Sequence, residues 1–303
     1  MSFEITVLGC GSASPTSYRN HTSQFVQVQD RCFLIDCGEG TQIQLRKNKI
    51  RMQKIQAVFI SHLHGDHYFG LPGLLSTFHL FGREKELDLY APANLLNILQ
   101  SLFNASNTYL SYKLNFHPLN FMSPALLFED KRVEVHSFPL RHSIETCGFL
   151  VKEKIKPRKI NRKAVDAFEV PVYELNKIKD GADYIKADGT LVENTKLTFD
   201  PEPSLSYAYC SDTVYYPALC DFIKGADLLY HEATFAKDCE ALAKKTKHST
   251  AEHAALIAKK ADVKMLMLGH YSARYPDLKL LLDEAKLVFE NTVLADDGLN
   301  VLL

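Results

Sequence analysis

The feature that most restricts the fold is a run of metal-binding side chains directly after an apolar segment. Ala57–Ile60 is four apolar residues in a row, which is typical of a strand buried on both faces. His62, His64, Asp66 and His67 then follow within six residues. A buried strand that ends in such a cluster predicts a layered α/β protein with a functional site at the strand end.

The spacing inside this cluster suits metal binding. His62 and His64 are two residues apart, so both can point the same way from an extended segment. Gly65 permits a sharp turn that brings Asp66 and His67 round to face a second ion. Imidazole and carboxylate groups at this density suit zinc, and four such groups would be costly to bury without a metal.

Three further residues of types that commonly bind metal each follow an apolar segment that is predicted to be a strand. They are His142, Asp212 and His270. Side chains just past strand ends converge in open α/β sheets, so these three can complete a site with the cluster after Ile60. Each is weak evidence alone, because a lone histidine is more often a surface or capping residue and Asp212 could cap a helix. The set of seven favours a pair of zinc ions.

The remaining elements alternate between strands and helices, which implies sheets with helices packed outside and places the chain in the α/β class. No internal repeat is visible. Expected strands are Glu4–Leu8, Gln24–Val28, Cys32–Asp36, Ala57–Ile60, Leu87–Ala91, Val133–Phe138, Gly148–Val151, Leu205–Cys210, Leu228–His231 and Val263–Leu268. Expected helices are Thr41–Lys47, Asn94–Phe103, Tyr215–Ile223, Thr250–Lys260 (with Ser249 or Thr250 as its N-cap) and Asp277–Phe289.

One stretch, Lys152–Asp200, departs from this alternation. It is rich in Lys, Asp, Glu, Pro and Gly, lacks a clear period, and begins with the most basic part of the chain. One interpretation is a solvated loop, and the other is an arm that grips a substrate. We expect a single domain over 1–303 with an inserted substrate-binding arm at about 152–200.

Composition limits the partners and the compartment. The formal net charge of the 303 residues is −1, so a polyanionic partner must be held by a local basic patch or by metal. The chain start has no basic n-region, and no apolar run approaches the ~18 residues of a membrane span. The seven cysteines are scattered without a C-x-x-C pair, which indicates free thiols. We expect a cytoplasmic protein with no membrane contact.

The H-x-H-x-D-H cluster with a later His, Asp and His resembles the metallo-β-lactamase superfamily. Further segments are similar to the motifs of ribonuclease Z, the tRNA 3′ endonuclease, in its short form. These segments are Pro15–Asn20, His231–Phe235, His248–Thr250 and Gly269–Tyr275. The resemblance runs along nearly the whole chain, and it implies a four-layer αβ/βα sandwich.

The resemblance also implies two zinc ions per chain and the residues that hold them. One ion would be bound by His62, His64 and His142, the other by Asp66, His67 and His270, and both by a bridging Asp212.

The implied activity is removal of the 3′ trailer from precursor tRNA by phosphodiester hydrolysis, leaving a 3′-hydroxyl on the tRNA. The family assigns Asp66 as the general base that orients or deprotonates the attacking water. It assigns His248, supported by Glu232, to the leaving 3′ oxygen. A carboxylate that touches His248 would favour its protonated form. The short form is usually a homodimer, so we expect one here.

Substrate contacts are expected from the family-like motifs and from the basic start of the arm: Arg19, Asn20, Lys156, Arg158, Lys159 and Arg274. Two departures from the family stand out. Val170–Leu175 lacks the Gly-Pro-rich tip of the usual arm, and Ser17 stands where the family often has lysine.

Two alternative functions stay open. The first is another dinuclear zinc hydrolase of this fold, acting on a small phosphodiester, lactone or thioester, since metal ligands alone do not separate these substrates. The second is a non-catalytic RNA-binding module with a degenerate metal site, which the seven filled ligand positions argue against.

Overall fold

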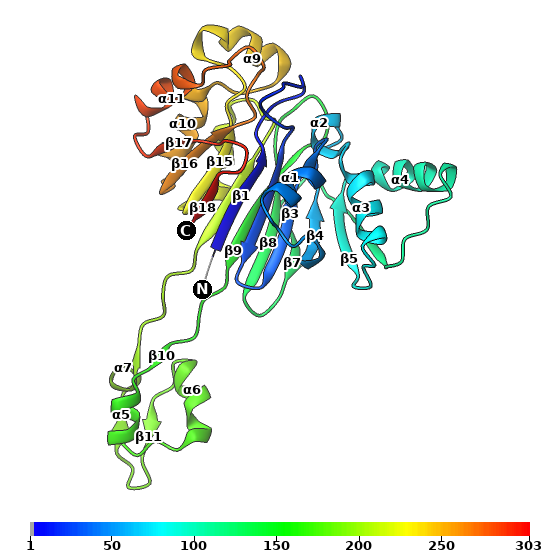
Figure 1. The fold of residues 1–303 in the computed structure, drawn as a ribbon. Helices are drawn as coiled ribbons and strands as arrows, with labels where there is room; N and C mark the ends of the chain where they lie inside the picture. The colour runs from blue at the N-terminus through cyan, green and yellow to red at the C-terminus, as the bar shows by residue number, and fades with distance from the viewer. Residues whose placement is uncertain (1–2) are drawn as a thin grey trace.

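The computed structural model describes residues 3–303 and contains two seven-stranded sheets packed face to face (Figure 1). The first sheet has, in spatial order, β18 (Asn300–Leu302), β1 (Phe3–Gly9), β2 (Ser23–Val28), β3 (Arg31–Ile35), β4 (Ile55–Phe59), β5 (Leu87–Ala91) and β6 (Leu114–Pro118). The second has β17 (Thr292–Leu294), β16 (Met265–Gly269), β15 (Leu228–Glu232), β14 (Ser206–Cys210), β9 (Cys147–Glu153), β8 (Val133–Pro139) and β7 (Ala125–Glu129).

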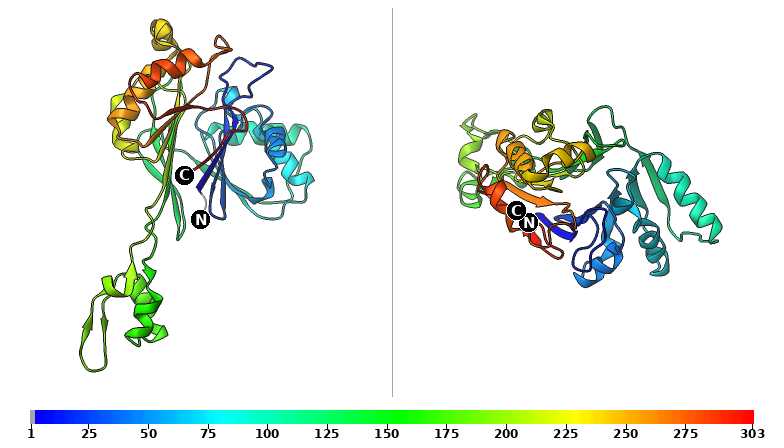
Figure 2. Two further views of the ribbon diagram at one scale, coloured as in Figure 1. Left: turned by 60° about the vertical axis from the view of Figure 1, so that its left-hand side comes forward. Right: turned by 90° about the horizontal axis from the view of Figure 1, so that it is seen from above.

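Helices cover the outer face of each sheet, which confirms the predicted four-layer sandwich (Figure 2). The first sheet carries α1 (Thr41–Lys47), α3 (Leu71–Leu80) and α4 (Asn94–Ala105), with the short α2 (Gly65–Tyr68) at its edge. The second carries α8 (Cys220–Ile223), α10 (Ala251–Lys260) and α11 (Lys279–Lys286), and α9 (Glu240–Thr246) lies beyond the ends of its strands, at the top of Figure 1. Short 3₁₀ turns are η1 (Met52–Lys54), η2 (Val172–Glu174), η3 (Pro217–Leu219) and η4 (Lys237–Cys239).

The apolar run in β4 shows how the layers are held together. Ala57 and Phe59 belong to the core between the two sheets, whereas Val58 and Ile60 belong to the core under the first helix layer. This alternation follows from the period of two along a strand. The prediction of a strand buried on both faces is therefore confirmed.

The register of the second sheet brings functional strand ends together. β14, β15 and β16 run parallel, so their carboxyl ends meet at one edge of the sheet. Cys210 pairs with His231, and Glu232 pairs with Gly269. The residues that directly follow these three strands are thus held side by side.

The chain leaves the second sheet after Glu153 and returns at Ser206, between the adjacent antiparallel strands β9 and β14. Figure 1 shows the intervening arm reaching away from the two sheets. The arm contains β10 (Lys159–Ile160), α5 (Arg162–Ala167), α6 (Leu175–Lys179), β11 (Tyr184–Ile185), β12 (Leu191–Val192), α7 (Asn194–Leu197) and β13 (Thr198–Phe199). Its own small core consists of Val165, Val170, Ile178, Val192 and Leu197, so the interpretation as a simple solvated loop is wrong.

Two predicted helices are shorter than expected. Over Tyr215–Ile223 only η3 and α8 form, because the chain enters through a 3₁₀ turn that begins at Pro217. Over Asp277–Phe289 the helix is limited to Lys279–Lys286. The N-cap of α10 is Thr250, whose hydroxyl accepts a hydrogen bond from the backbone of His253.

Two expectations about composition can be compared with the structure. Within residues 3–303, no helix is both long enough and apolar enough to cross a membrane. All seven cysteines are free thiols, and six of them are buried while Cys239 is partly exposed. The sequence-based expectation of unpaired cysteines is therefore confirmed.

Candidate metal centre and active site

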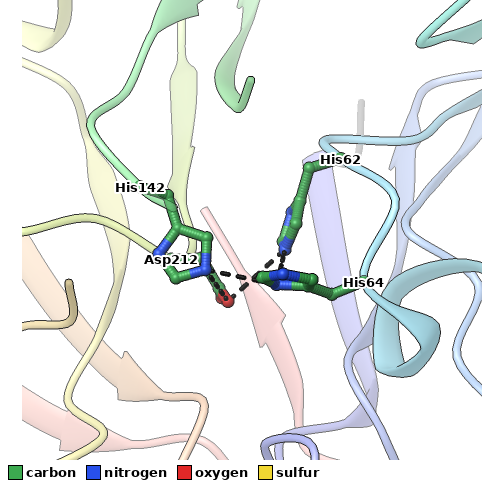
Figure 3. Close-up of side chains that lie close together, drawn as sticks. All are labelled: His62, His64, His142 and Asp212. Carbon is green, nitrogen blue, oxygen red and sulfur yellow. Dashed lines mark hydrogen bonds and ion pairs between the residues drawn. The ribbon is translucent and has the colours of Figure 1, made fainter. Parts of the chain in front are cut away.

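All seven predicted ligands converge at the carboxyl ends of strands from both sheets, and Figure 3 shows four of them. His62 and His64 follow β4 of the first sheet, and His142 and Asp212 follow β8 and β14 of the second. The centre therefore exists only where the two sheets face each other. No separate half of the chain could form it.

The first group of donor atoms consists of three imidazole nitrogens and one carboxylate oxygen. His62 Nε2 lies 3.1 Å from His64 Nδ1, which lies 3.2 Å from His142 Nε2. Oδ2 of Asp212 is 3.4 Å from His62 Nε2 and 3.5 Å from His142 Nε2. These are the side chains that point toward one another in Figure 3.

The second group uses the other oxygen of the same carboxylate. Oδ1 of Asp212 lies 3.0 Å from His270 Nε2 and 3.3 Å from His67 Nε2. Oδ2 of Asp66 lies 3.3 Å from His270 Nε2 and 3.4 Å from His67 Nε2. Asp212 thus belongs to both groups, one oxygen to each.

These separations fit two tetrahedral metal sites. Ligand atoms about 2.0–2.1 Å from a tetrahedral ion lie roughly 3.3–3.4 Å from one another. The eight donor pairs named above lie 3.0–3.5 Å apart, and all donor atoms of the first group lie within 4.8 Å of one another, as do those of Asp66, His67 and His270. His67 Nε2 is fully buried and has no hydrogen-bond partner among residues 3–303, although a buried polar atom without one is costly. A cation at this position would satisfy it.

The protonation of the first group suits metal binding as well. Burial lowers the pKa of His62 to about 4 and also lowers the pKa of His64 and of His142. These three imidazoles are therefore neutral at pH 7, which is the form that ligates metal.

Asp36 is a part of the centre that sequence reasoning missed. Its Oδ2 accepts a hydrogen bond from His67 Nδ1 at 2.7 Å and from the Tyr209 hydroxyl at 2.7 Å. Ser61 donates to the same carboxylate through its backbone N–H and its hydroxyl. With Nδ1 of His67 donating, Nε2 is left to bind metal. The only signal in the sequence was an acidic residue at the end of a predicted strand.

The backbone at the centre is strained where ligands are presented. Asp36, Asp212 and His270 have φ values of 56°, 41° and 57°, in the left-handed region that residues other than glycine rarely adopt. At Gly65 the chain turns from the extended His64 into α2, as expected, but without a positive φ. A Cβ atom at this position would meet the Phe69 ring at 2.2 Å, so a larger residue would force that ring to move.

Beside the two groups of metal-binding donors, a buried carboxylate forms a hydrogen bond with a further histidine. Glu232, the last residue of β15, is fully buried, and its Oε1 accepts a hydrogen bond from His248 Nδ1 at 2.9 Å. The backbone N–H of Thr213 donates to the same oxygen at 2.7 Å. Burial lowers the pKa of His248, but the charge and hydrogen bond of Glu232 outweigh burial and raise it to about 9. The contact that the sequence suggested is therefore present.

Thr234 connects this pair to the metal-type ligands, and sequence reasoning gave it no role. Its hydroxyl donates to Oε2 of Glu232 at 2.6 Å and so accepts from His270 Nδ1 at 2.9 Å. That hydrogen bond leaves His270 Nε2 free to face Asp212.

The donor atoms of Asp212, His248 and His270 also lie within 4.8 Å of one another, so distance alone would allow a third metal group. We assign His248 to another role, because its Nδ1 forms a hydrogen bond of 2.9 Å with Oε1 of Glu232, a carboxylate that belongs to neither donor group.

The predicted substrate-binding residues near the N-terminus are engaged within the protein. The guanidinium of Arg19 donates to the carbonyls of Tyr275 and Pro276 at 2.9 and 3.0 Å. The backbone and side chain of Asn20 both donate to Asp297. These contacts tie the loop around Arg19 to the second sheet, and substrate binding by these two residues stays a prediction.

The predicted residues of the arm lie on the segment that projects from the sheets and are also paired. Lys156 lies 2.7 Å from Glu153, Arg158 lies 2.6 Å from Asp200, and Lys159 pairs with Glu202. Arg274 differs, because it is exposed and its guanidinium lies 5.8 Å from the centre of the Phe235 ring, which is next to His248. Of the six residues, Arg274 is the one placed beside the candidate catalytic groups.

Comparison with known proteins identifies the family. A model of the family described as Anti-Pycsar protein Apyc1 matches residues 3–156, and the chain is a member of the family that this model describes. A ribonuclease Z from Bacteroides fragilis is 48% identical over 301 residues, covering 99% of each chain. A ribonuclease Z from Porphyromonas gingivalis is 42% identical over 99% of this chain and 98% of its own length.

Solved structures agree with this result. Human tRNase Z in its short form matches with a TM-score of 0.71 and 27% identity, covering 98% of each chain. A metallo-β-lactamase fold protein from Bacillus subtilis matches with the same TM-score at 20% identity over the full length of both chains, which supports the fold. Because curated relatives match it almost from end to end, this chain belongs to the ribonuclease Z family of metallo-β-lactamase fold enzymes.

Proposed function

We propose that this protein is a zinc-dependent endoribonuclease that removes the 3′ trailer from precursor tRNA, leaving a 3′-hydroxyl on the tRNA. The observation that carries the proposal is the position of Asp212, whose two oxygens each complete a separate group of metal-type donors. The relatives named ribonuclease Z and the human structure named tRNase Z support RNA as the substrate.

We assign two zinc ions per chain to the two donor groups. Nitrogen and carboxylate donors at tetrahedral separations suit zinc. The first ion would be held by His62, His64, His142 and Asp212, and the second by Asp66, His67, His270 and Asp212. Zinc, when bound, supplies a nucleophilic water at neutral pH and neutralises negative charge on phosphate oxygens.

Asp66 would orient the attacking water through a hydrogen bond. Although burial raises its pKa, the neighbouring His67 and His270 hold that pKa well below the ordinary value for an aspartate. The group is therefore a carboxylate at neutral pH and a weak base. A group of this kind is better suited to accept a hydrogen bond and fix a geometry than to remove a proton.

His248 would give its proton to the 3′ oxygen as the phosphorus–oxygen bond breaks. Its pKa of about 9 keeps the imidazole protonated at neutral pH, and its side chain is 16% exposed, so it can reach a substrate. Glu232 holds the imidazole in place through Nδ1, so that Nε2 is the proton-donating atom.

The arm would bind the body of the precursor tRNA as an insertion within a single domain that spans 1–303. It projects from the sheets (Figure 1) and carries exposed aromatic side chains, such as Tyr173 in η2, which is 76% exposed. Exposed aromatic rings can stack on RNA bases, so this surface could bind RNA without a Gly-Pro tip.

We propose that two chains form a homodimer through an apolar surface on the first helix layer. Leu80, Phe81, Leu102 and Tyr109 lie at or near the ends of α3 and α4 and are 77%, 53%, 47% and 80% exposed. Large apolar side chains gathered on one surface are typical of an interface. Light scattering should give twice the 34.3 kDa of one chain. Leu80→Glu should give one chain mass, whereas Leu287→Glu, at an 88% exposed position on the other layer, should not.

We place the enzyme in the cytoplasm, because the seven cysteines are free and a reducing compartment keeps thiols unpaired. Fractionation of cells that produce the tagged protein, with a periplasmic marker as control, tests this location.

Mapping the cut on a precursor tRNA transcript tests the proposed function. The zinc-loaded protein should cut once at the boundary between tRNA and trailer, with a 3′-hydroxyl on the tRNA and a 5′-phosphate on the trailer. Hydrolysis of bis(p-nitrophenyl) phosphate without cleavage of the transcript would instead support the alternative of a small-molecule hydrolase. Binding of the transcript without any hydrolysis would support a non-catalytic RNA-binding protein.

A further inference from the structure

A second cationic surface lies at the rim of the candidate active site, outside the residues considered so far. Arg141, Lys244 and Lys247 line a pocket of about 500 Å³. Its apolar wall is formed by Leu140, Ile144 and Val214, and His142 forms its inner side. A pocket of this volume can hold a group of nucleotide size.

The three cations of this pocket lack carboxylate partners. Among residues 3–303, none of them lies within 4 Å of an Asp or Glu oxygen. The guanidinium of Arg141 is instead held 4.0 Å above the ring of Tyr216, and Lys247 donates to the backbone carbonyl of His142. Three unneutralised positive charges around a hollow favour an anionic ligand.

The pocket adjoins both the proposed metal ligand His142 and the proposed proton donor His248. Lys247, which follows α9, has a φ of 59°, and its carbonyl accepts a hydrogen bond from His142 Nδ1 at 2.8 Å. The next residue is His248, the group assigned to the leaving 3′ oxygen. The ring centres of His142 and His248 are 4.9 Å apart. The pocket therefore lies on the side of the centre where the leaving oxygen would be protonated.

We propose that this pocket, called here the flanking-nucleotide pocket, binds the nucleotide whose 3′ oxygen departs. Its apolar wall would contact the ribose and base, and Arg141, Lys244 and Lys247 would bind the phosphate on the 5′ side of that nucleotide. This proposal rests on the proposed function. Its chemistry is that of a single RNA nucleotide next to the scissile phosphate.

Kinetics of substituted enzymes test the pocket. Arg141→Ala and Lys244→Ala should each raise the KM for precursor tRNA about tenfold, with kcat nearly unchanged, because each removes a charge-assisted contact to the bound nucleotide. Hydrolysis of bis(p-nitrophenyl) phosphate, which has no flanking nucleotide, should stay unchanged and show that the variants are folded. Lys247 is left intact because its carbonyl holds His142.

Lys245→Ala is the matched control. Lys245 is exposed in the same last turn of α9 but does not line the pocket. If the lysines served only to complement the helix dipole, Lys244→Ala and Lys245→Ala would behave alike. Equal KM values for both variants would overturn the proposal.

A substrate with one neutral linkage identifies the phosphate. A short precursor RNA with a methylphosphonate on the 5′ side of the nucleotide before the cut should be cleaved about tenfold less efficiently by the unsubstituted enzyme. The double variant Arg141→Ala, Lys244→Ala should show no further loss, because the contact is already absent. Equal losses in both enzymes would overturn the pocket assignment alone. Failure of the unsubstituted enzyme to cleave any precursor RNA would overturn the proposed function, and the pocket with it.

Discussion

The candidate metal centre and the basic arm both contain clustered charged groups, but they differ in whether those groups have partners within the protein. In the centre, Asp66, Asp212 and their imidazole neighbours other than the partly exposed His64 are buried, and the Nε2 atom of His67 has no hydrogen-bond partner among residues 3–303. In the arm, six of the seven cationic side chains between Lys152 and Lys163 lie within 3.9 Å of a carboxylate oxygen, as Arg158 does with Asp200.

This difference shows that density of charge in the sequence does not by itself indicate a binding site. Buried donors that converge without satisfying one another require a ligand. Surface cations that face carboxylates, within the arm or on the neighbouring strands β7 and β8, are already neutralised, and each such pair is worth only about 0–1 kcal/mol. We therefore expect chemistry to depend strongly on the centre and binding to depend moderately on the arm.

The largest effect should follow from Asp212→Asn, which removes the charge that both donor groups share. Metal affinity should fall by more than about 100-fold, since even changes outside the ligand shell cost 10- to 100-fold. Hydrolysis of both precursor tRNA and bis(p-nitrophenyl) phosphate should be lost, while binding of the transcript by the arm persists. Elemental analysis measures the bound zinc. Retention of two zinc ions by this variant would show that the Asp212 carboxylate is not needed to hold them.

The next effect concerns Glu232→Gln. The pKa of His248 is about 9, so its imidazole is protonated below pH 9. The rate should therefore fall as the pH rises through 9. Without the carboxylate charge, burial would lower the pKa, and the alkaline fall should move to about pH 6.5 or lower. At pH 8 the rate should drop about 30-fold or more.

A pH–rate profile measures this change, and Glu240→Gln is the matched control. Glu240 pairs with His253 at 3.4 Å outside the centre, so its loss should not move the profile. An unchanged alkaline limb in Glu232→Gln would show that His248 is not the proton donor.

Removal of the arm should have a smaller and more selective effect. Lys152 and Ser206 are paired on the adjacent strands β9 and β14, so a two-residue turn could replace residues 154–205. The kcat/KM for precursor tRNA should fall about 10- to 100-fold because phosphate contacts are lost. Hydrolysis of bis(p-nitrophenyl) phosphate should not change. Equal loss of both activities would contradict the separation of binding from chemistry.

The smallest effect tests the neutralised charges of the arm directly. The double variant Asp200→Asn, Glu202→Gln releases Arg158 and Lys159 from their carboxylate partners. Binding of precursor tRNA should strengthen about two- to fivefold, and its dependence on salt should become steeper. Glu169→Gln, at an exposed acidic residue of the arm, should change neither. Weaker binding in the double variant would show that the ion pairs organise the arm rather than mask it.

Much of the centre could be predicted from the sequence, because metal ligands follow strands with recognisable apolar runs. α1 and β5 have the predicted bounds, Thr41–Lys47 and Leu87–Ala91, since both have local signals. Asp36 and Thr234 were missed, because their roles arise only when neighbouring strands pair. Asp36 follows β3 beside β4 and contacts His67, and Thr234 follows β15 beside β16 and contacts His270.

The fold of the arm and the partners of its charged side chains, by contrast, could not be predicted from the sequence. Its small core is built from residues separated by up to 32 positions, from Val165 to Leu197, without a regular period. The basic run was visible, but the acidic partners Asp200 and Glu202 stand about forty residues away. Pairing at that separation is a property of the tertiary fold. Phosphate binding by Lys156, Arg158 and Lys159 stays a prediction, and because all three are paired we expect it to be weaker than their number suggests.

Anomalous diffraction at the zinc edge from crystals grown with zinc tests the account most directly. Two peaks should lie on opposite sides of the Asp212 carboxylate, one within ligand distance of His62, His64 and His142 and the other of Asp66, His67 and His270. A single peak, or peaks that Asp212 does not touch, would contradict the assignment of a shared carboxylate at the centre.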